Sequence, residues 1–327
     1  MSQIDLKLRA GDWVEVRSAL EIAETLDTNG SLDGLPFMPE MQTFCNRRFQ
    51  VLRPAEKTCL EVGTLYYAIQ EFRNNDVVLL NELRCSGIDH DGCQRACFLF
   101  WKSAWLRKIE PTQSESTPQA IPDPIKAPLI LRTMSAPGRY VCQATELVRA
   151  TQPIPRLRKI LKCFSDIRSG SRGVLEMARL VWLPIWRKAT AWFPRKVLVG
   201  NLKKTPVGNL NLQPGELVII KPSSEIKETL DGKGRNRGMV CDLGMCRYSG
   251  GTYKVRSRLD RMISEPTGEM RKVESTVILD GLQCLCWNTL GGCPRQDFMY
   301  WREVWLKRAN GHAESTKSTP IGKDEYR

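Results

Sequence analysis

Cysteine is the residue type in this sequence with the clearest capacity for chemistry. The chain carries 12 Cys and only 2 His among its 327 residues. Thiolates are therefore the main candidate ligands for a metal ion, and a His-rich metal site or His-based catalysis is disfavoured. Ten of the Cys fall into two groups of five, one in each terminal third of the chain. This pairing predicts two related sites.

Three pairs of Cys occupy equivalent places in the two groups: Cys45 and Cys246, Cys85 and Cys284, Cys93 and Cys293. Tetrahedral zinc needs four ligands. We expect the fourth to differ between the groups: Cys59, Cys97 or His90 in the first, and Cys286 or Cys241 in the second. The predicted metal ligands are Cys45, Cys59, Cys85, Cys93, Cys97, Cys246, Cys284, Cys286 and Cys293.

Zinc is the expected metal, and an iron–sulfur cluster is the alternative. No CxxC pair occurs in the sequence, and the observed spacings are not a recognised zinc or ferredoxin pattern. The competing interpretation is a set of reduced, buried thiols, which behave as small hydrophobic groups in a reducing compartment.

The elements that must position these Cys belong to an internal repeat. GDWVEVRSALEIAETLD at 11–27 matches GELVIIKPSSEIKETLD at 215–231, an offset of 204. Further along, VVLLNELRC matches TVILDGLQC, and CQRACFLFWKSAWLRK matches CPRQDFMYWREVWLKR, in the same order. Chance similarity of this density is very improbable, so the sequence indicates a duplicated domain.

Each copy is predicted to be mostly β. WVEVR and ELVIIK, FQVLR and YKVRS, and VVLLNEL and TVILDGL are short runs with the composition of strands. A short helix is expected after the first strand, capped by Ser18 in one copy and by Ser223 or Ser224 in the other. The paired Trp of WKSAWL and WREVWL are expected in the core, with ligand stacking as the alternative. About five strands and one helical insertion fit a small SH3-like barrel by analogy.

The predicted fold class is therefore mainly β with a helical insert: two tandem SH3-like barrels that flank a basic helical segment. The predicted domains are a first barrel at 8–110, a Pro/Ser-rich linker at 111–128, the basic helical segment at 129–211, a second barrel at 212–309 and a polar, disordered tail at 310–327.

The formal net charge of +13 is concentrated in the middle of the chain. Residues 111–210 hold seventeen Lys and Arg against five Asp and Glu, whereas the two repeats are close to neutral. The segment VLEMARLVWLPIWRKATAWFPRK is predicted to form a helix with one apolar face, with basic residues largely outside that face and three Trp. This composition is typical of an interfacial helix at anionic lipid. A core helix between the barrels explains the same pattern. The predicted membrane- or partner-binding residues are Arg179, Trp182, Trp186, Arg187, Lys188, Trp192, Arg195 and Lys196.

Enzyme signatures are scarce. The sequence contains no P-loop, GxSxG or HExxH motif, nor a GxGxxG after a strand. Asp89, His90 and Asp91 next to Cys93 form the one polar cluster that could support a Cys nucleophile, and the second copy lacks it. We therefore expect a protein that is not an enzyme.

The N-terminal residues lack the apolar core of a secretory signal, and no run of about 18 apolar residues occurs. We expect a cytoplasmic protein, with peripheral attachment at the inner face of the membrane as the alternative.

PVGNLNLQPGELV (206–218), CRYSGGTYKV (246–255), CPRQDFMYWREVWL (293–306) and LDGLPFMPEMQTFC (32–45) resemble a bacterial family of duplicated, Cys-containing proteins for which no activity is established. The resemblance covers both repeats and the YVCQATEL stretch. It implies a bacterial source, and the Cys that the family carries at the positions of Cys246, Cys284 and Cys293 favours a metal.

These observations predict a non-enzymatic binding or scaffold protein. Two β-domains, each stabilised by a bound metal ion, would flank a basic amphipathic segment. This segment would dock on an anionic membrane surface or an acidic protein partner. The first alternative is a nucleic-acid-binding protein that uses the same basic segment. The second is a Cys- or metal-dependent enzyme built on Cys85, Cys93, His90 and Asp91 of the first repeat.

Overall fold

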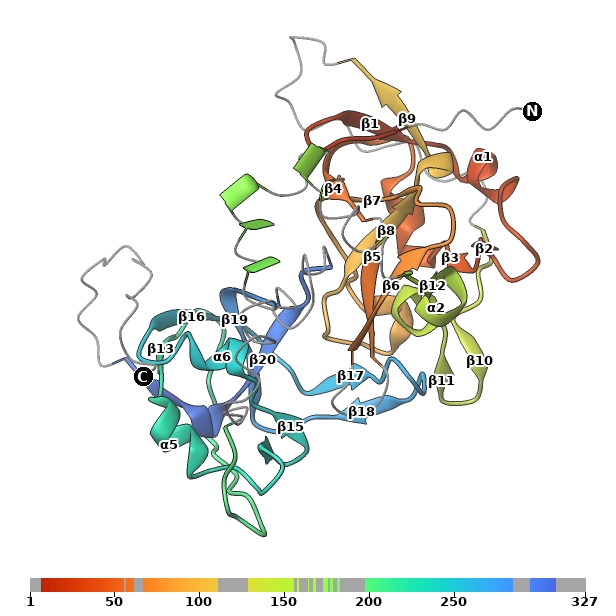
Figure 1. Ribbon diagram of the computed structural model, residues 1–327. Coiled ribbons are helices and arrows are strands. Elements are labelled where there is room, and N and C mark those ends of the chain that lie inside the picture. The colour runs from red at the N-terminus through yellow and green to blue at the C-terminus, as the bar shows by residue number, and fades with distance from the viewer. Residues whose placement is uncertain are drawn as a thin grey trace. The chain divides into compact units, whose positions relative to one another are not determined.

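The chain divides into two compact units (Figure 1). The computed structural model describes residues 7–55, 57–61, 67–110, 129–155, 198–284 and 295–309, together with scattered positions between 158 and 182. Unit 1 comprises Met1–Arg195, Asp260–Val273 and Gln283–Phe298, and unit 2 comprises Lys196–Leu259, Glu274–Leu282 and Met299–Arg327.

The core of unit 1 is a curled, five-stranded antiparallel sheet of half-barrel form, with the strand order β8-β7-β4-β1-β9 (Figure 1). Its strands are β1 (Trp13–Val16), β4 (Arg48–Pro54), β7 (Val77–Arg84), β8 (Phe98–Lys102) and β9 (Leu106–Ile109). Residues 77–80 of β7 and all of β8 are buried. The predicted apolar run VVLLNEL therefore forms a largely buried strand of this sheet, and the edge strand β8 beside it is buried as well.

Unit 2 repeats this sheet strand for strand, in the order β20-β19-β16-β13-β21. Its strands are β13 (Leu217–Ile220), β16 (Thr252–Arg258), β19 (Thr276–Gln283), β20 (Phe298–Arg302) and β21 (Leu306–Arg308). The pairing also repeats: Val14 faces Phe49 in unit 1, and Val218 faces Tyr253 in unit 2. Val218 and Tyr253, which follow Val14 and Phe49 by 204 residues, therefore occupy the same positions in the second sheet.

The sequence ETLD occurs in both copies, and its Thr makes the same hydrogen bond in each unit. The hydroxyl of Thr25 accepts a hydrogen bond from the indole of the buried Trp105 at 3.1 Å, and Thr229 does the same for Trp305 at 3.0 Å. The four Trp of the paired motifs are fully buried. This confirms that they belong to the cores.

Short elements surround the sheet of unit 1. They include α1 (Ala19–Ala23), β2 (Ser31–Leu32), β3 (Leu35–Pro36) and the 3-10 helices η1 (Pro39–Phe44), η2 (Ile88–His90) and η3 (Ser103–Trp105). A second sheet has the order β12-β6-β5, with β5 (Lys57–Glu61), β6 (Tyr67–Phe72) and β12 (Thr151–Pro153). The hairpins are β10 (Met134–Ala136) with β11 (Arg139–Tyr140), and β17 (Arg261–Ile263) with β18 (Met270–Lys272); α2 (Gln143–Ala150) lies between β11 and β12 in the chain.

Unit 2 has a matching but reduced set: α5 (Ser223–Lys227), β14 (Arg235–Asn236), β15 (Met239–Val240), α6 (Leu243–Cys246) and η4 (Glu303–Trp305). The predicted short helix is present in both units. Ser18 caps α1 as expected, with Glu21 completing a capping box. The expectation for α5 was wrong, because Pro222 occupies the N-cap and supplies no side-chain bond.

Candidate metal centre

Three side chains of unit 1 bring ligand atoms together: Glu40, Cys85 and His90. The carboxylate oxygen, the thiol sulfur and the imidazole nitrogen all lie within 4.8 Å of one another. Glu40 and His90 are buried, and Cys85 is half-buried. Among the described residues, these three form the one group of three or more His, Cys, Asp or Glu side chains whose ligand atoms lie this close together.

Glu40 is held in place by the loop that carries Cys85. It lies in η1, and its Oε2 accepts hydrogen bonds from the backbone N–H of Ser86 at 2.7 Å and from the Ser86 hydroxyl at 2.8 Å. Its second oxygen, Oε1, is buried and has no hydrogen-bond partner outside the cluster among the described residues. A buried carboxylate oxygen in this state is costly, and a cation would satisfy it.

His90 ends η2 and is fully buried. Its Nε2 lies 3.0 Å from the carbonyl oxygen of Val141. Because a carbonyl only accepts, Nε2 carries the proton, and in the neutral ring Nδ1 keeps its lone pair. Nδ1 is also buried without a partner among the described residues. A metal-binding His usually donates its other ring N–H to a carbonyl or carboxylate oxygen, and this hydrogen bond fixes its tautomer.

The loop between Cys85 and His90 is fixed by its backbone. Cys85 follows β7, and its N–H donates to the carbonyl of Cys97 at 2.8 Å. Gly87 begins η2 with φ of 74°, and a Cβ at that position would collide with the carbonyl oxygen of Cys93. Only glycine combines this φ with so close an approach. The loop therefore presents Cys85 and His90 in a defined arrangement.

Burial raises the pKa of the Cys85 thiol, and the negative charge of Glu40 and a hydrogen bond with it raise that pKa further. Without a cation the thiol is thus protonated at neutral pH. A coordinated metal ion reverses this preference, because it stabilises the thiolate directly.

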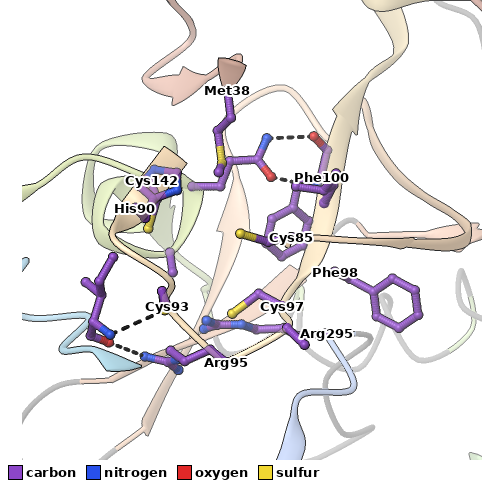
Figure 2. Close-up of a pocket in the computed structure, with 15 residues that line it drawn as sticks. Met38, Cys85, His90, Cys93, Arg95, Cys97, Phe98, Phe100, Cys142 and Arg295 are labelled. Carbon is purple, nitrogen blue, oxygen red and sulfur yellow. Dashed lines mark hydrogen bonds between the residues drawn. The ribbon is translucent and has the colours of Figure 1, made fainter. Parts of the chain in front are cut away.

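A cavity of about 30 Å³ lies beside this cluster and is lined by Cys85 and His90. That volume holds a water molecule or a metal ion but no organic substrate of ordinary size. Figure 2 shows three further Cys around it, Cys93, Cys97 and Cys142. Burial raises the pKa of Cys97 to about 12 and also raises that of Cys142. Cys97 and Cys142 are therefore neutral thiols in the wall of this cavity.

The donor set fits zinc. A mixed set of thiolate, imidazole and carboxylate is typical of zinc sites, at roughly 2.0–2.3 Å from the ion. Ligand atoms around a tetrahedral ion of that size are roughly 3.3–3.8 Å apart. A cluster that spans at most 4.8 Å needs only a small contraction to reach that geometry.

The predicted metal ligands of the first repeat separate in the structure. Cys85 joins the cluster, and Cys93 and Cys97 line the adjoining cavity. Cys45 lies in the apolar core, where burial raises its pKa to about 11. Cys59 lies on β5, and its carbonyl accepts a hydrogen bond from Arg295 at 3.1 Å.

The second predicted set is not assembled within one unit. Cys246 belongs to unit 2, whereas Cys284 belongs to unit 1. Cys286 and Cys293 lie outside the described residues. Cys284 keeps the backbone role of Cys85, since its N–H donates to the carbonyl of Asp297 at 2.7 Å.

Of the predicted membrane- or partner-binding residues, Trp182 is described: it is helical and 62 % exposed. Arg179, Trp186, Arg187, Lys188, Trp192, Arg195 and Lys196 lie outside the described residues. In the described part of the chain, no helix is long and apolar enough to cross a membrane.

Sequence reasoning missed Glu40 as a candidate ligand. The available signal for Glu40 is its place as the sole charged residue in the run GLPFMPEMQTFC at 34–45. A carboxylate in such a run is either solvent-exposed or paired with a specific partner. Its pairing with a loop more than forty residues away is visible only in the fold.

Comparison of the chain with protein-family models, curated proteins and solved structures finds no match. The geometry of the site is therefore the basis for any functional assignment.

Proposed function

We propose that this chain is a binding or scaffold protein whose first repeat is stabilised by a zinc ion held by Glu40, Cys85 and His90. The observation that carries the proposal is the convergence of three ligand atoms in a buried site. In addition, Glu40 Oε1 and His90 Nδ1 are buried, and outside the cluster neither has a hydrogen-bond partner among the described residues. Buried polar atoms are nearly always satisfied in native proteins, and a cation satisfies both at once.

Zinc is favoured over an iron–sulfur cluster by the kinds of donor present. Iron–sulfur clusters are held mainly by several Cys thiolates, whereas this cluster contributes one thiol, one imidazole and one carboxylate. The ion would tie η1 to the loop after β7. Its role would be structural, because the adjoining cavity of about 30 Å³ leaves no room for a substrate.

The SH3-like description of the two sheets is part of the proposal. In each unit, the first strand lies between the last strand and a three-strand meander. A 3-10 turn, η3 in one unit and η4 in the other, precedes that last strand. This arrangement supports an SH3-like barrel, a fold that serves many binding functions.

Docking would use the basic middle segment, with an anionic membrane surface or an acidic protein as its partner. The support is the concentration of positive charge at 111–210 and the exposure of Trp182. Nucleic acid is the less favoured partner. Flotation with anionic vesicles at low salt tests the membrane, and a salt-dependent shift of DNA or RNA tests the alternative.

A Cys-dependent enzyme receives less support. A nucleophilic Cys needs a lowered pKa and access to its substrate. In this site, burial raises the pKa of Cys85, Cys97 and Cys142, and His90 is fully buried.

Elemental analysis of the full-length protein, produced with zinc in the medium, tests the metal. We expect about one zinc ion per chain. Cys85→Ser should lower the zinc content to roughly a tenth or less, because a ligand is lost. Cys45→Ser is the matched control, since it removes a buried thiol outside the cluster and should leave the zinc content unchanged.

Cobalt substitution gives a second readout of the same site. Bound through a thiolate, cobalt should give a sulfur-to-metal absorption band that Cys85→Ser abolishes and Cys45→Ser retains. Circular dichroism of each variant identifies a failure to fold. A zinc content near zero in the wild-type protein, or an equal loss in both variants, contradicts the proposal.

A further inference from the structure

The loop between β7 and β8, residues 85–97, makes contacts with two different parts of unit 1. It carries His90 of the proposed zinc site, and the residues after His90 hold the hairpin β17–β18. The side-chain oxygen of Gln94 accepts hydrogen bonds from the N–H groups of Asp260 and Arg261, at 2.5 Å and 3.1 Å. The N–H of Gln94 donates to the carbonyl of Arg261 at 3.1 Å. One loop therefore connects a metal ligand with a hairpin that comes from the second repeat.

The two neighbours of Gln94 in the chain bind the same strand of the hairpin. The sulfur of Cys93 accepts a hydrogen bond from the N–H of Ile263 at 3.4 Å, and the Arg95 guanidinium donates to the Ile263 carbonyl at 3.2 Å (Figure 2). Cys93 and Ile263 also share a small apolar cluster with Tyr140. The hairpin is a sheet of two strands, and such a sheet is marginally stable by itself in water. Its order therefore depends on these contacts with the loop.

His90 is connected to the hairpin by two short paths. Along the chain, the N–H of Cys93 donates to the His90 carbonyl at 3.1 Å. Through space, His90 Nε2 lies 3.0 Å from the carbonyl oxygen of Val141. The residue before Val141 is Tyr140, whose N–H donates at 2.8 Å to the carbonyl of Gly268 in the turn of the hairpin. A displacement of His90 would thus disturb both segments that hold the hairpin.

We propose that the zinc ion held by Glu40, Cys85 and His90 fixes the hairpin β17–β18 on unit 1, and that removal of the ion releases the hairpin while the two five-stranded sheets stay folded. This inference rests on the zinc site proposed above. Without the cation, Glu40 Oε1 and His90 Nδ1 are buried without a hydrogen-bond partner outside the cluster among the described residues. Buried polar groups in that state favour a rearrangement toward water or new partners.

The two sheets have apolar cores of their own, which include the four buried Trp of the paired motifs. The hairpin contributes Ile263 to a separate and much smaller cluster. A rearrangement of the loop therefore acts on the hairpin before it acts on the sheets, because the part of a protein with the fewest buried apolar contacts opens first. The site thereby makes the docking of this hairpin depend on zinc.

Hydrogen–deuterium exchange of the full-length protein, followed by mass spectrometry, tests this coupling. The protein is produced with zinc in the medium and is compared before and after a chelator removes the ion, with the zinc content measured in each sample. After removal, we expect the amides of residues 260–272 to exchange at least about tenfold faster and those of β4 and β16 to change by less than about twofold. Zinc added back should restore the slow exchange.

Gln94→Ala separates docking of the hairpin from metal binding. It removes the acceptor of two hairpin N–H groups but no metal ligand. Exchange in the hairpin should therefore become at least about tenfold faster, while the zinc content stays at about one ion per chain. Gln213→Ala is the matched control, because it removes the same kind of side chain from an exposed position of unit 2 and should leave exchange in the hairpin unchanged.

Three results would overturn the inference and leave the zinc site intact. Equal exchange of the hairpin with and without bound zinc means that the ion does not influence it. Equal acceleration of the hairpin and of β4 means that the ion stabilises unit 1 as a whole. Unchanged exchange in Gln94→Ala means that the loop does not hold the hairpin. A zinc content near zero in the wild-type protein contradicts the zinc site itself, and this inference with it.

Discussion

At the scale of single residues, Gln143 shows how one buried polar side chain joins several elements. It lies at the start of α2 and is 3 % exposed. Its amide nitrogen donates to the carbonyls of Pro36 at 3.1 Å and Phe100 at 2.8 Å, and its oxygen accepts from the N–H of Phe100 at 2.8 Å. The side chain thereby ties α2 to β3 and to β8, the edge strand of the sheet.

Gln143→Ala should lower the free energy of unfolding of unit 1 by about 3 kcal/mol, because it leaves three buried backbone groups without partners. Urea unfolding followed by Trp fluorescence measures the loss. Asn29→Ala, which removes an exposed amide of the same unit, should change the midpoint little. Equal effects of the two substitutions would show that the amide of Gln143 contributes nothing specific.

At the scale of elements, the two short helices α1 and α5 occupy equivalent places but begin differently. Ser18 caps α1: its hydroxyl accepts from the N–H of Glu21 at 3.3 Å, and the Glu21 carboxylate accepts from the N–H of Ser18 at 3.0 Å. In α5 the N-cap is Pro222, which makes no side-chain bond. The first helix therefore depends on its cap, and the second depends on its packing through Ile226, which is fully buried.

Ser18→Ala should destabilise unit 1 by about 1 kcal/mol, the usual effect of removing a helix cap. Ser224→Ala, at an exposed position of α5, should change stability by no more than a few tenths of a kcal/mol. Thermal unfolding of both variants checks the difference. A similar shift in each would contradict the assignment of the cap to Ser18 alone.

At the scale of the whole molecule, the two repeats do not correspond to the two units. The hairpin β17–β18 belongs to the second repeat by sequence and to unit 1 by structure. It carries Glu265, whose side chain is 2 % exposed and lies 2.8 Å from Arg295 and 3.4 Å from Arg95. Burial alone would raise the pKa of Glu265, but Arg295 and Arg95 outweigh it and lower that pKa. A buried ionic cluster therefore joins the second repeat's hairpin to a loop of the first repeat.

Glu265→Gln should destabilise unit 1 by about 3 kcal/mol, because two buried Arg side chains lose a counter-charge. The midpoint of urea unfolding measures the effect. Glu269→Gln on the same hairpin is the control, since Glu269 is exposed and its substitution should leave the midpoint nearly unchanged. If both variants unfold at the wild-type midpoint, the cluster does not hold the hairpin in unit 1.

Much of the fold follows from the sequence alone. The repeat, the strands at 13–16 and 217–220, and the burial of Trp101, Trp105, Trp301 and Trp305 were all predicted from local patterns and are present. These features depend on apolar periodicity and on motifs such as ETLD. Because such patterns extend over only a few residues, they can be recognised in the sequence. The duplication also fixed which strands correspond, because equal patterns require equal registers.

Only the tertiary structure decided how the reactive residues are grouped. Equivalent Cys of the two repeats have different neighbours: Cys85 meets Glu40 and His90, whereas Cys284 joins no such group among the described residues. Positions 40 and 85 converge because η1 packs against η2 and the loop after β7, an outcome of side-chain packing that no local pattern encodes. The sequence by itself therefore determined the β repeat and its register. Long-range packing determined which thiol lies beside a carboxylate and an imidazole and could therefore hold a metal.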